Sequence, residues 1–128
     1  MCIRDSRRIG WIDLVQLRQA VRVNGLTDIV LTKLDILNGL KKIKACIGYK
    51  VEEKVITEMP ASLTTFRKAK PIYKTISCWD SLPDEVWKKG FKSLPGSLKD
   101  YIGFIEDEVN CSISIVSVGP QRHETIIR

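Results

Sequence analysis

The stretch Asp28-Ile29-Val30-Leu31-Thr32-Lys33-Leu34-Asp35 decides the class of fold. Its first half is a short apolar run rich in β-branched residues, which is typical of a strand buried on both faces of a parallel or mixed sheet. Its second half becomes polar where that strand would end, and residues 36–40 predict one helical turn. Open α/β sheets bind ligands beyond the carboxyl ends of their strands, so this sheet edge is a candidate binding edge.

An amphipathic helix is predicted before this strand, over residues 11–25. Its apolar face is formed by residues at helical spacing: Leu14, Leu17, Ala20 and Val21. Asp13 can cap the first turn by accepting a hydrogen bond from a free backbone N–H. Asn24-Gly25 supplies residues that tolerate the left-handed conformation found at helix ends.

Strands and one further helix are predicted after the opening stretch. A half-buried strand over residues 43–49 is expected to form a hairpin with residues 55–57, and a further short strand is expected at 72–76. A helix over 98–109 precedes a buried strand at 113–118, and a last short strand is expected at 124–127. Trp79 and Trp87 are expected to be packing anchors. The alternation of elements predicts an α/β fold, with a mixed β-sheet and flanking helices.

Composition restricts the class of protein. The chain has 128 residues with 44% hydrophobic and 28% charged residues, which argues for one folded domain and against disorder. It contains no apolar run long enough to span a membrane and no apolar secretion segment near its start, so we expect a cytoplasmic location. The four cysteines and the single His123 lack the close spacing of zinc ligands, and reduced thiols are expected.

The net charge of +6 suits a partner that carries negative charge. The basic residues are scattered, and the densest groups are at residues 41–44 and 67–70. Neither group has interleaved aromatic residues that could stack on bases. A small basic nucleic-acid-binding module is therefore kept as the alternative function, and it predicts binding that falls steeply with salt.

The tetrapeptide Thr32-Lys33-Leu34-Asp35 carries recognisable chemistry. It differs by one residue from the Asn-Lys-x-Asp pattern with which many GTPases read guanine. The carboxylate of Asp35 could accept hydrogen bonds from both the ring N–H and the amino group of guanine, a donor pair that adenine lacks. The aliphatic stem of Lys33 could lie along the base. The tetrapeptide alone would also fit a piece of a signalling GTPase.

Two other segments could contact a nucleotide. Ser117-Val118-Gly119-Pro120 follows a predicted buried strand, and its backbone N–H groups could meet an acceptor such as the guanine O6. The pair Arg7-Arg8 suits contacts with phosphate or ribose. Neither segment is specific when taken alone.

The ordered set of motifs resembles the adenylosuccinate synthetase family, from Arg7 to nearly the last residue. The segments that carry this resemblance are, in order, Arg7-Arg8-Ile9-Gly10-Trp11-Ile12-Asp13, Leu17-Arg18, Asn24-Gly25-Leu26, Leu31-Thr32-Lys33-Leu34-Asp35, Pro71-Ile72-Tyr73, Trp79, Tyr101-Ile102, Ser117-Val118-Gly119-Pro120, Arg122 and Glu124-Thr125-Ile126. The resemblance implies the C-terminal part of a larger, single-domain, P-loop-like, GTP-dependent ligase fold.

The resemblance also implies a reaction and a set of binding residues. The family joins IMP and aspartate to give adenylosuccinate in AMP biosynthesis, with hydrolysis of GTP and with Mg²⁺. Guanine would be held by Lys33, Leu34 and Asp35, and Ser117, Val118 and Gly119 would close over it. Arg7 would contact GTP. The family implies a homodimer, with no membrane and no nucleic acid as partners.

The chain also departs from the family pattern. It has no glycine-rich phosphate loop, and the family's catalytic and Mg²⁺-binding residues would lie upstream, so we expect no catalytic residue and no metal site here. Residues 4–8 would align with the family's Gly-Arg-x-Arg-Arg stretch, but Arg4 and Asp5 replace its first two residues. We therefore expect residues 1–6 to be a foreign junction, residues 7–128 to be the guanine-binding part, and the isolated chain to lack synthetase activity.

Overall fold

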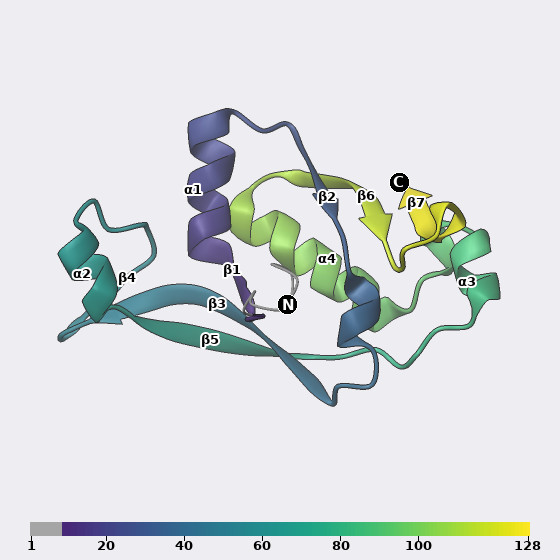
Figure 1. Ribbon diagram of the computed structural model, residues 1–128, viewed down its shortest axis with the longest axis horizontal. Helices are drawn as coiled ribbons and strands as arrows, with labels where there is room; N and C mark the ends of the chain where they lie inside the picture. Colours follow the sequence, from purple (N-terminus) through teal and green to yellow (C-terminus); the bar gives the residue numbers. More distant parts are fainter. Residues whose placement is uncertain (1–8) are drawn as a thin grey trace, which may run out of the picture.

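Two β-sheets share one main hydrophobic core in the computed structural model, which describes residues 9–128 (Figure 1). The first sheet contains β1 (Ile12–Asp13), β3 (Lys42–Val51), β4 (Lys54–Ile56) and β5 (Lys70–Ser77). The second contains β2 (Asp28–Leu31), β6 (Ser112–Ser117) and β7 (Thr125–Ile127). The α-helices are α1 (Leu14–Asn24), α2 (Leu63–Lys68), α3 (Asp84–Lys88) and α4 (Gly96–Val109).

Both sheets combine parallel and antiparallel pairs. In the first sheet, β3 is parallel to β1 and antiparallel to β4 and β5. In the second, β2 is parallel to β6, and β7 is antiparallel to β6. The predicted α/β class with a mixed sheet is therefore confirmed, although the strands form two sheets and not one.

The helix α1 begins and ends where the sequence predicts caps. The carboxylate of Asp13 accepts hydrogen bonds from the backbone N–H groups of Val15 and Gln16, at 3.0 and 3.1 Å. Gly25 has a φ of 60°, and its backbone N–H bonds to the carbonyl of Val21. The helix is shorter than the predicted range of 11–25 because Ile12 and Asp13 pair with β3.

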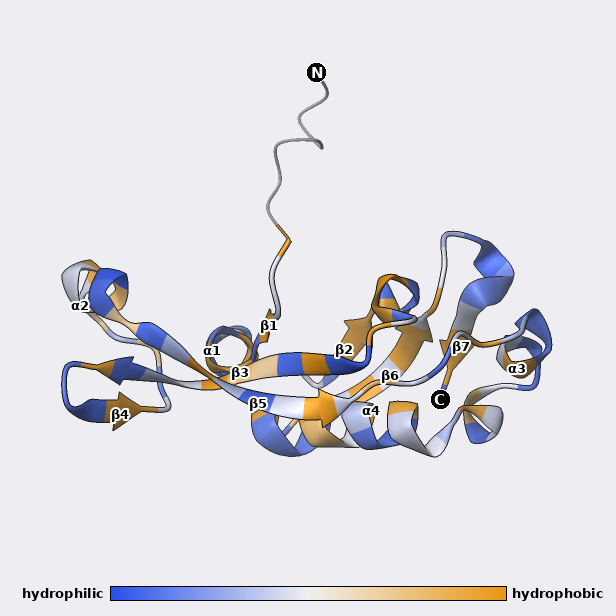
Figure 2. Ribbon diagram, turned by 90° about the horizontal axis from the view of Figure 1, so that it is seen from below, coloured by the Kyte–Doolittle hydropathy of each residue, from blue (hydrophilic) through white to orange (hydrophobic). Residues whose placement is uncertain are grey.

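The central element of the core is α4, which lies along one side of both sheets, below β3 and β6 in Figure 2. Its inward face is the predicted one, and all five residues are buried: Leu98, Tyr101, Ile102, Ile105 and Val109. They pack with Leu14 of α1, Ile43 of β3 and Ile113 of β6. Helix α4 thereby joins the two sheets into one folded unit.

The strand β2 is less buried than predicted. Its residues alternate between exposed and half-buried, and the Val30 side chain is 54% exposed. The cause is its place in the sheet, because β2 pairs with β6 on one side and has no second partner among residues 9–128. The helical turn that follows is the 3₁₀ turn η2 (Leu34–Leu37), which begins two residues earlier than expected.

The paired strands β3 and β5 form a long ribbon, and β3 contains the alternating apolar residues that predicted a half-buried strand. Figure 2 shows hydrophilic and hydrophobic bands alternating along β3. The hairpin to β4 has the predicted position, and β5 extends beyond the predicted residues 72–76. Trp79 and Trp87 are buried as expected, and the Trp79 indole N–H donates to the Asn38 side chain at 2.9 Å.

The short helices α2 and α3 were not predicted from the sequence, whereas the thiols that were expected to be reduced are free where the structure describes them. Cys46, Cys78 and Cys111 are free thiols, and Cys2 lies outside the described residues. Among residues 9–128, no helix is long and apolar enough to cross a membrane.

Candidate functional site

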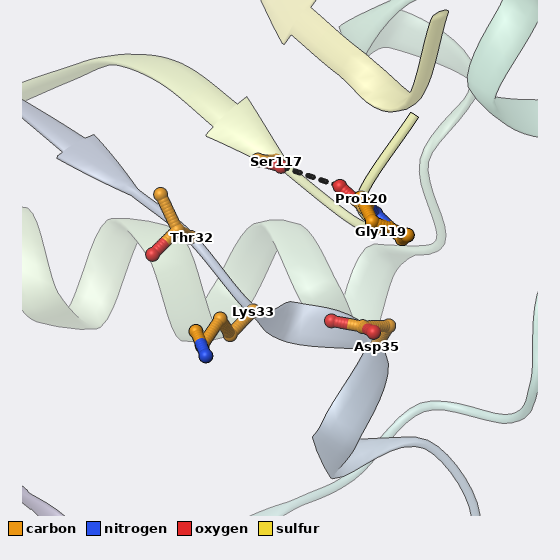
Figure 3. A pocket seen from close by; sticks show the side chains of 6 residues that line it. All are labelled: Thr32, Lys33, Asp35, Ser117, Gly119 and Pro120. Carbon is orange, nitrogen blue, oxygen red and sulfur yellow. Dashed lines mark hydrogen bonds between the residues drawn. The ribbon is translucent and has the colours of Figure 1, made fainter. Parts of the chain in front are cut away.

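A pocket of about 440 Å³ opens at the carboxyl ends of β2 and β6. These strands are parallel, with Leu31 opposite Val116, so the segments that follow them leave the sheet at the same edge. Figure 3 shows the two segments on either side of the pocket. The lining residues come from the two predicted tetrapeptides, namely Thr32, Lys33, Asp35, Ser117, Gly119 and Pro120.

Lys33 has an unusual backbone conformation. Its φ and ψ are 61° and 36°, in the left-handed region that non-glycine residues seldom occupy. This conformation ends the extended course of β2 and starts η2, which turns Asp35 toward the pocket. A strained backbone is typical of a residue whose position is fixed by function, and Lys33 lies in the candidate site.

Buried and pocket-lining residues alternate in both segments. Leu34, between Lys33 and Asp35, is only 2% exposed and packs in the core. Val118, between Ser117 and Gly119, is 3% exposed and packs in the same core. The side chains of Leu34 and Val118 therefore anchor the two segments, and only their backbones could reach a ligand.

The turn after β6 is held by hydrogen bonds within itself. The Ser117 hydroxyl donates to the Gly119 carbonyl at 3.1 Å (Figure 3). The Val118 N–H donates to the Glu124 carbonyl at 2.9 Å, and the Gln121 N–H donates to the Glu124 carboxylate at 2.5 Å. Glu124 belongs to the 3₁₀ turn η4 (Arg122–Glu124), which precedes β7.

A smaller pocket of about 180 Å³ shares Thr32 and Lys33 with the first. Gly10 and Trp11 line it from the N-terminal segment, and Tyr101 lines it from α4. Burial, together with the neighbouring Cys78 thiol, raises the pKa of Tyr101 to about 12, so its hydroxyl stays neutral near pH 7. Arg7, the predicted GTP contact, lies outside the described residues.

The donor set in residues 9–128 does not suit a metal ion. No group of three His, Cys, Asp or Glu side chains gathers in that part of the chain.

Comparison with known proteins identifies the source of this site. The sequence profile described as adenylosuccinate synthetase matches residues 3–126. The chain belongs to the adenylosuccinate synthetase family. The resemblance carried by the ordered motifs is therefore confirmed.

Relatives in this family match the chain over nearly all of its length. The adenylosuccinate synthetase of Caldanaerobacter subterraneus subsp. tengcongensis is 48% identical over 121 residues, which are 94% of this chain and 28% of that protein. The Geobacter sulfurreducens synthetase is 45% identical over 121 residues, with the same two shares. This chain therefore spans a little over a quarter of the length of these relatives.

A solved structure shows the same arrangement of elements. The structure described as fully ligated adenylosuccinate synthetase from Plasmodium falciparum superimposes with a TM-score of 0.82 at 29% identity. The superposition covers 93% of this chain and 28% of that chain. The fold of this part of the synthetase family is thus reproduced here.

The structure brings together the side chains or backbones of Lys33, Asp35, Ser117 and Gly119 in one pocket. It adds Pro120 and Thr32, which belong to the tetrapeptides but have no role in the sequence prediction. Glu124 was not predicted to be part of the site. The only signal for it was the Gln121-x-x-Glu124 spacing of a capping box, which the structure contains.

Proposed function

We propose that this chain supplies the guanine-recognition edge of an adenylosuccinate synthetase. The observation that carries the proposal is the pocket at the ends of β2 and β6, which combines an acidic residue, a lysine and a glycine turn. This combination provides acceptors for the donor edge of guanine and a donor for its O6 atom. Adenine has an acceptor at N1, where guanine has a donor, and a donor amino group at C6, where guanine has the O6 acceptor. The site would therefore discriminate between the bases by hydrogen bonding.

Each member of the site has a separate role in this proposal. The Asp35 carboxylate accepts hydrogen bonds from the ring N–H and the amino group, and the Lys33 stem covers one face of the base. The backbone of Leu34 and Val118 completes the two segments, and Ser117 and Gly119 close over the base. Arg7 remains a predicted contact with GTP.

The reaction belongs to the longer enzyme in this proposal. IMP and aspartate give adenylosuccinate while GTP is hydrolysed, and the phosphoryl-transfer residues and the Mg²⁺ ligands come from the rest of a homodimeric enzyme. The chain itself contributes the selection of GTP. The basic nucleic-acid-binding alternative has weaker support, because Lys42 and Lys44 are exposed residues that alternate with the buried Ile43 and Ala45 along a solvated strand face.

The proposal is tested in a chimera in which this chain replaces the matching 28% of the Caldanaerobacter synthetase. Asp35→Asn exchanges one acceptor oxygen for a donor. We expect a loss of about 1.5–3 kcal/mol for GTP, which is about 10- to 150-fold in affinity. Xanthosine triphosphate presents an acceptor where guanine has its amino group, so its affinity should rise. Titration of each nucleotide gives the dissociation constants.

The matched control is Asp107→Asn, which makes the same change of charge at an exposed position on α4. It should leave the affinities for both nucleotides unchanged. A folded chimera with no affinity for GTP, or an Asp35→Asn variant with unaltered preference for GTP, would refute the proposed role of this pocket.

A further inference from the structure

We propose that Glu124 is a positioning residue that fixes the Ser117–Gln121 turn against the base, so that the Gly119 N–H meets the 6-oxo group of the purine. This inference rests on the proposed recognition of guanine. The Glu124 side chain does not line the pocket. It acts through Gly119, which does line the pocket.

Three atoms of Glu124 hold the turn. Its carbonyl accepts from the Val118 N–H at 2.9 Å, and its own N–H donates to the Gln121 carbonyl at 3.0 Å. Its carboxylate accepts from the Gln121 N–H at 2.5 Å. The first two bonds use backbone atoms, which substitution by alanine or glutamine keeps. The third depends on the side chain, and a carboxylate that accepts a backbone N–H makes one of the stronger hydrogen bonds in proteins.

The contact with Gly119 shows what the carboxylate does to the pocket. A Cβ atom added at Gly119 would collide with both carboxylate oxygens of Glu124. The backbone of Gly119 is outside the positive-φ region, so its conformation does not require glycine. The limit is one of space, because the Glu124 carboxylate occupies the side that a Cβ would take and would have to move aside for one. Gly119 thus both lines the pocket and packs against the Glu124 carboxylate.

Hydrogen bonds hold the peptide units on both sides of the Val118–Gly119 peptide, whose N–H could read the base. The Ser117 hydroxyl holds the Gly119 carbonyl at 3.1 Å, and the Glu124 carboxylate holds the Gln121 N–H on the other side of the turn. Within residues 9–128, the Gly119 N–H donates no hydrogen bond, which leaves it free for a ligand acceptor. Guanine and hypoxanthine share the 6-oxo acceptor, whereas only guanine has the amino group assigned to Asp35.

The two residues should therefore be separable by nucleotide. In the chimera with the Caldanaerobacter synthetase, we expect Glu124→Ala to weaken binding of GTP and of ITP by the same factor, about 5- to 15-fold. Glu124→Gln keeps an acceptor oxygen at the same reach, and should restore both affinities to within about threefold of the unsubstituted protein. The KM for GTP should rise by a larger factor than kcat falls, and the KM for IMP should not change. Asp35→Asn, in contrast, should change the ratio of GTP to ITP affinity.

Two further measurements separate positioning from general stability. Amide exchange at Gln121, followed in the 128-residue chain, should be faster in Glu124→Ala by about five- to tenfold and normal in Glu124→Gln. Gly119→Ala displaces the carboxylate, so the Gly119→Ala/Glu124→Ala double variant should bind GTP no more weakly than Glu124→Ala alone. The control is Glu53→Ala, which removes a charge in the exposed β3–β4 turn.

The outcomes distinguish the two proposals. If the unsubstituted chimera binds GTP, and the Glu124→Ala variant binds GTP and ITP with the same affinities as the unsubstituted chimera, Glu124 does not position the turn. If Glu124→Gln is as weak as Glu124→Ala, the charge and not the hydrogen bond matters, and the positioning role is wrong. If the folded, unsubstituted chimera does not bind GTP, the proposed recognition of guanine fails and this inference fails with it.

Discussion

Lys33 occupies a backbone conformation that costs free energy, and it lines the candidate site. Its φ of 61° costs about 1–2 kcal/mol for a residue with a Cβ atom. Lys33→Gly would remove this cost, although glycine loses about 0.5–1 kcal/mol more conformational entropy on folding. We expect the free energy of unfolding to rise by about 0.5–1 kcal/mol in urea denaturation, while the affinity of the chimera for GTP falls.

The control for this substitution is Lys42→Gly. Lys42 is exposed in the extended strand β3, where glycine has only its entropic disadvantage. The free energy of unfolding should fall there by about 0.5–1 kcal/mol. Equal losses at both positions would mean that the left-handed conformation of Lys33 stores no free energy.

Tyr101 should make stability depend on alkaline pH. Burial raises its pKa to about 12, above the unfolded value of about 10. Because the folded pKa is the higher one, the contribution is complete below pH 10 and is lost as the pH rises toward 12. The free energy of unfolding, measured with urea, should therefore fall between pH 10 and pH 12. Tyr101→Phe should make this fall smaller, by at most about 3 kcal/mol. An identical decline in both proteins would refute this assignment.

At the residue scale, the sequence indicated which residues would lie at one sheet edge, and Lys33 and Asp35 do line one pocket there. Their contacts with guanine stay a prediction, drawn from the paired acceptor that Asp35 offers and the long aliphatic stem of Lys33. The anchoring of Leu34 and Val118 could not be assigned, because it depends on which side of each segment faces α4. Glu124 escaped prediction because its effect on Gly119 is a matter of space between residues five apart, and no motif records this.

At the scale of elements, Arg18 connects three parts of the chain. Its Nε donates to the Glu108 carbonyl at 2.8 Å, and its guanidinium lies 3.2 Å from the Glu108 carboxylate. A second nitrogen donates to the Thr57 carbonyl at 2.5 Å. Helix α1 is thereby tied to the end of α4 and to the segment after β4. Both side chains of the ion pair are mostly covered, at 27% and 33% exposure, so solvent screens the pair only in part.

We expect Arg18→Ala to lower the free energy of unfolding by about 1–2 kcal/mol, because it leaves two carbonyls and a carboxylate without a charged donor. A matched control lies one turn further along α1. Arg22 pairs with Glu58, but these side chains are 58% and 70% exposed, so Arg22→Ala should cost less than about 0.5 kcal/mol. Thermal unfolding of both variants tests the difference. Similar losses would show that burial does not decide the strength of these contacts.

Two elements with a strong local signal were predicted well, whereas the short helices α2 and α3 and the features that depend on distant pairing were not. The caps of α1 and the apolar face of α4 are encoded within a few residues, and both were confirmed. The burial of β2 was predicted wrongly, because an apolar sequence does not reveal whether a strand lies at the edge of a sheet. The length of β5 was underestimated, because the residues at its two ends are extended through their pairing with β3 and carry no strand pattern of their own.

At the scale of the whole molecule, apolar side chains gather beside the N-terminal segment. Ile9, Trp11, Ile36 and Leu40 are 89%, 38%, 55% and 41% exposed, and with Leu37 they line an apolar pocket of about 350 Å³. On a different element, the edge of β2 is also unpaired among residues 9–128, and Val30 is exposed there. Contiguous apolar surface and free sheet edges both favour association between chains.

We therefore expect the 128-residue chain to associate with itself as its concentration rises. Ile36→Glu together with Leu40→Glu places charges in the apolar pocket, and should shift the chain toward a monomer because burying each carboxylate in a contact is costly. Val55→Glu is the control, since Val55 is 64% exposed in β4 at the far end of the ribbon and should leave association unchanged. Sedimentation velocity over a range of concentrations measures the effect. A chain that stays monomeric throughout, or equal association in both variants, would show that the pocket formed by Ile9, Trp11, Ile36, Leu37 and Leu40 does not drive the contact.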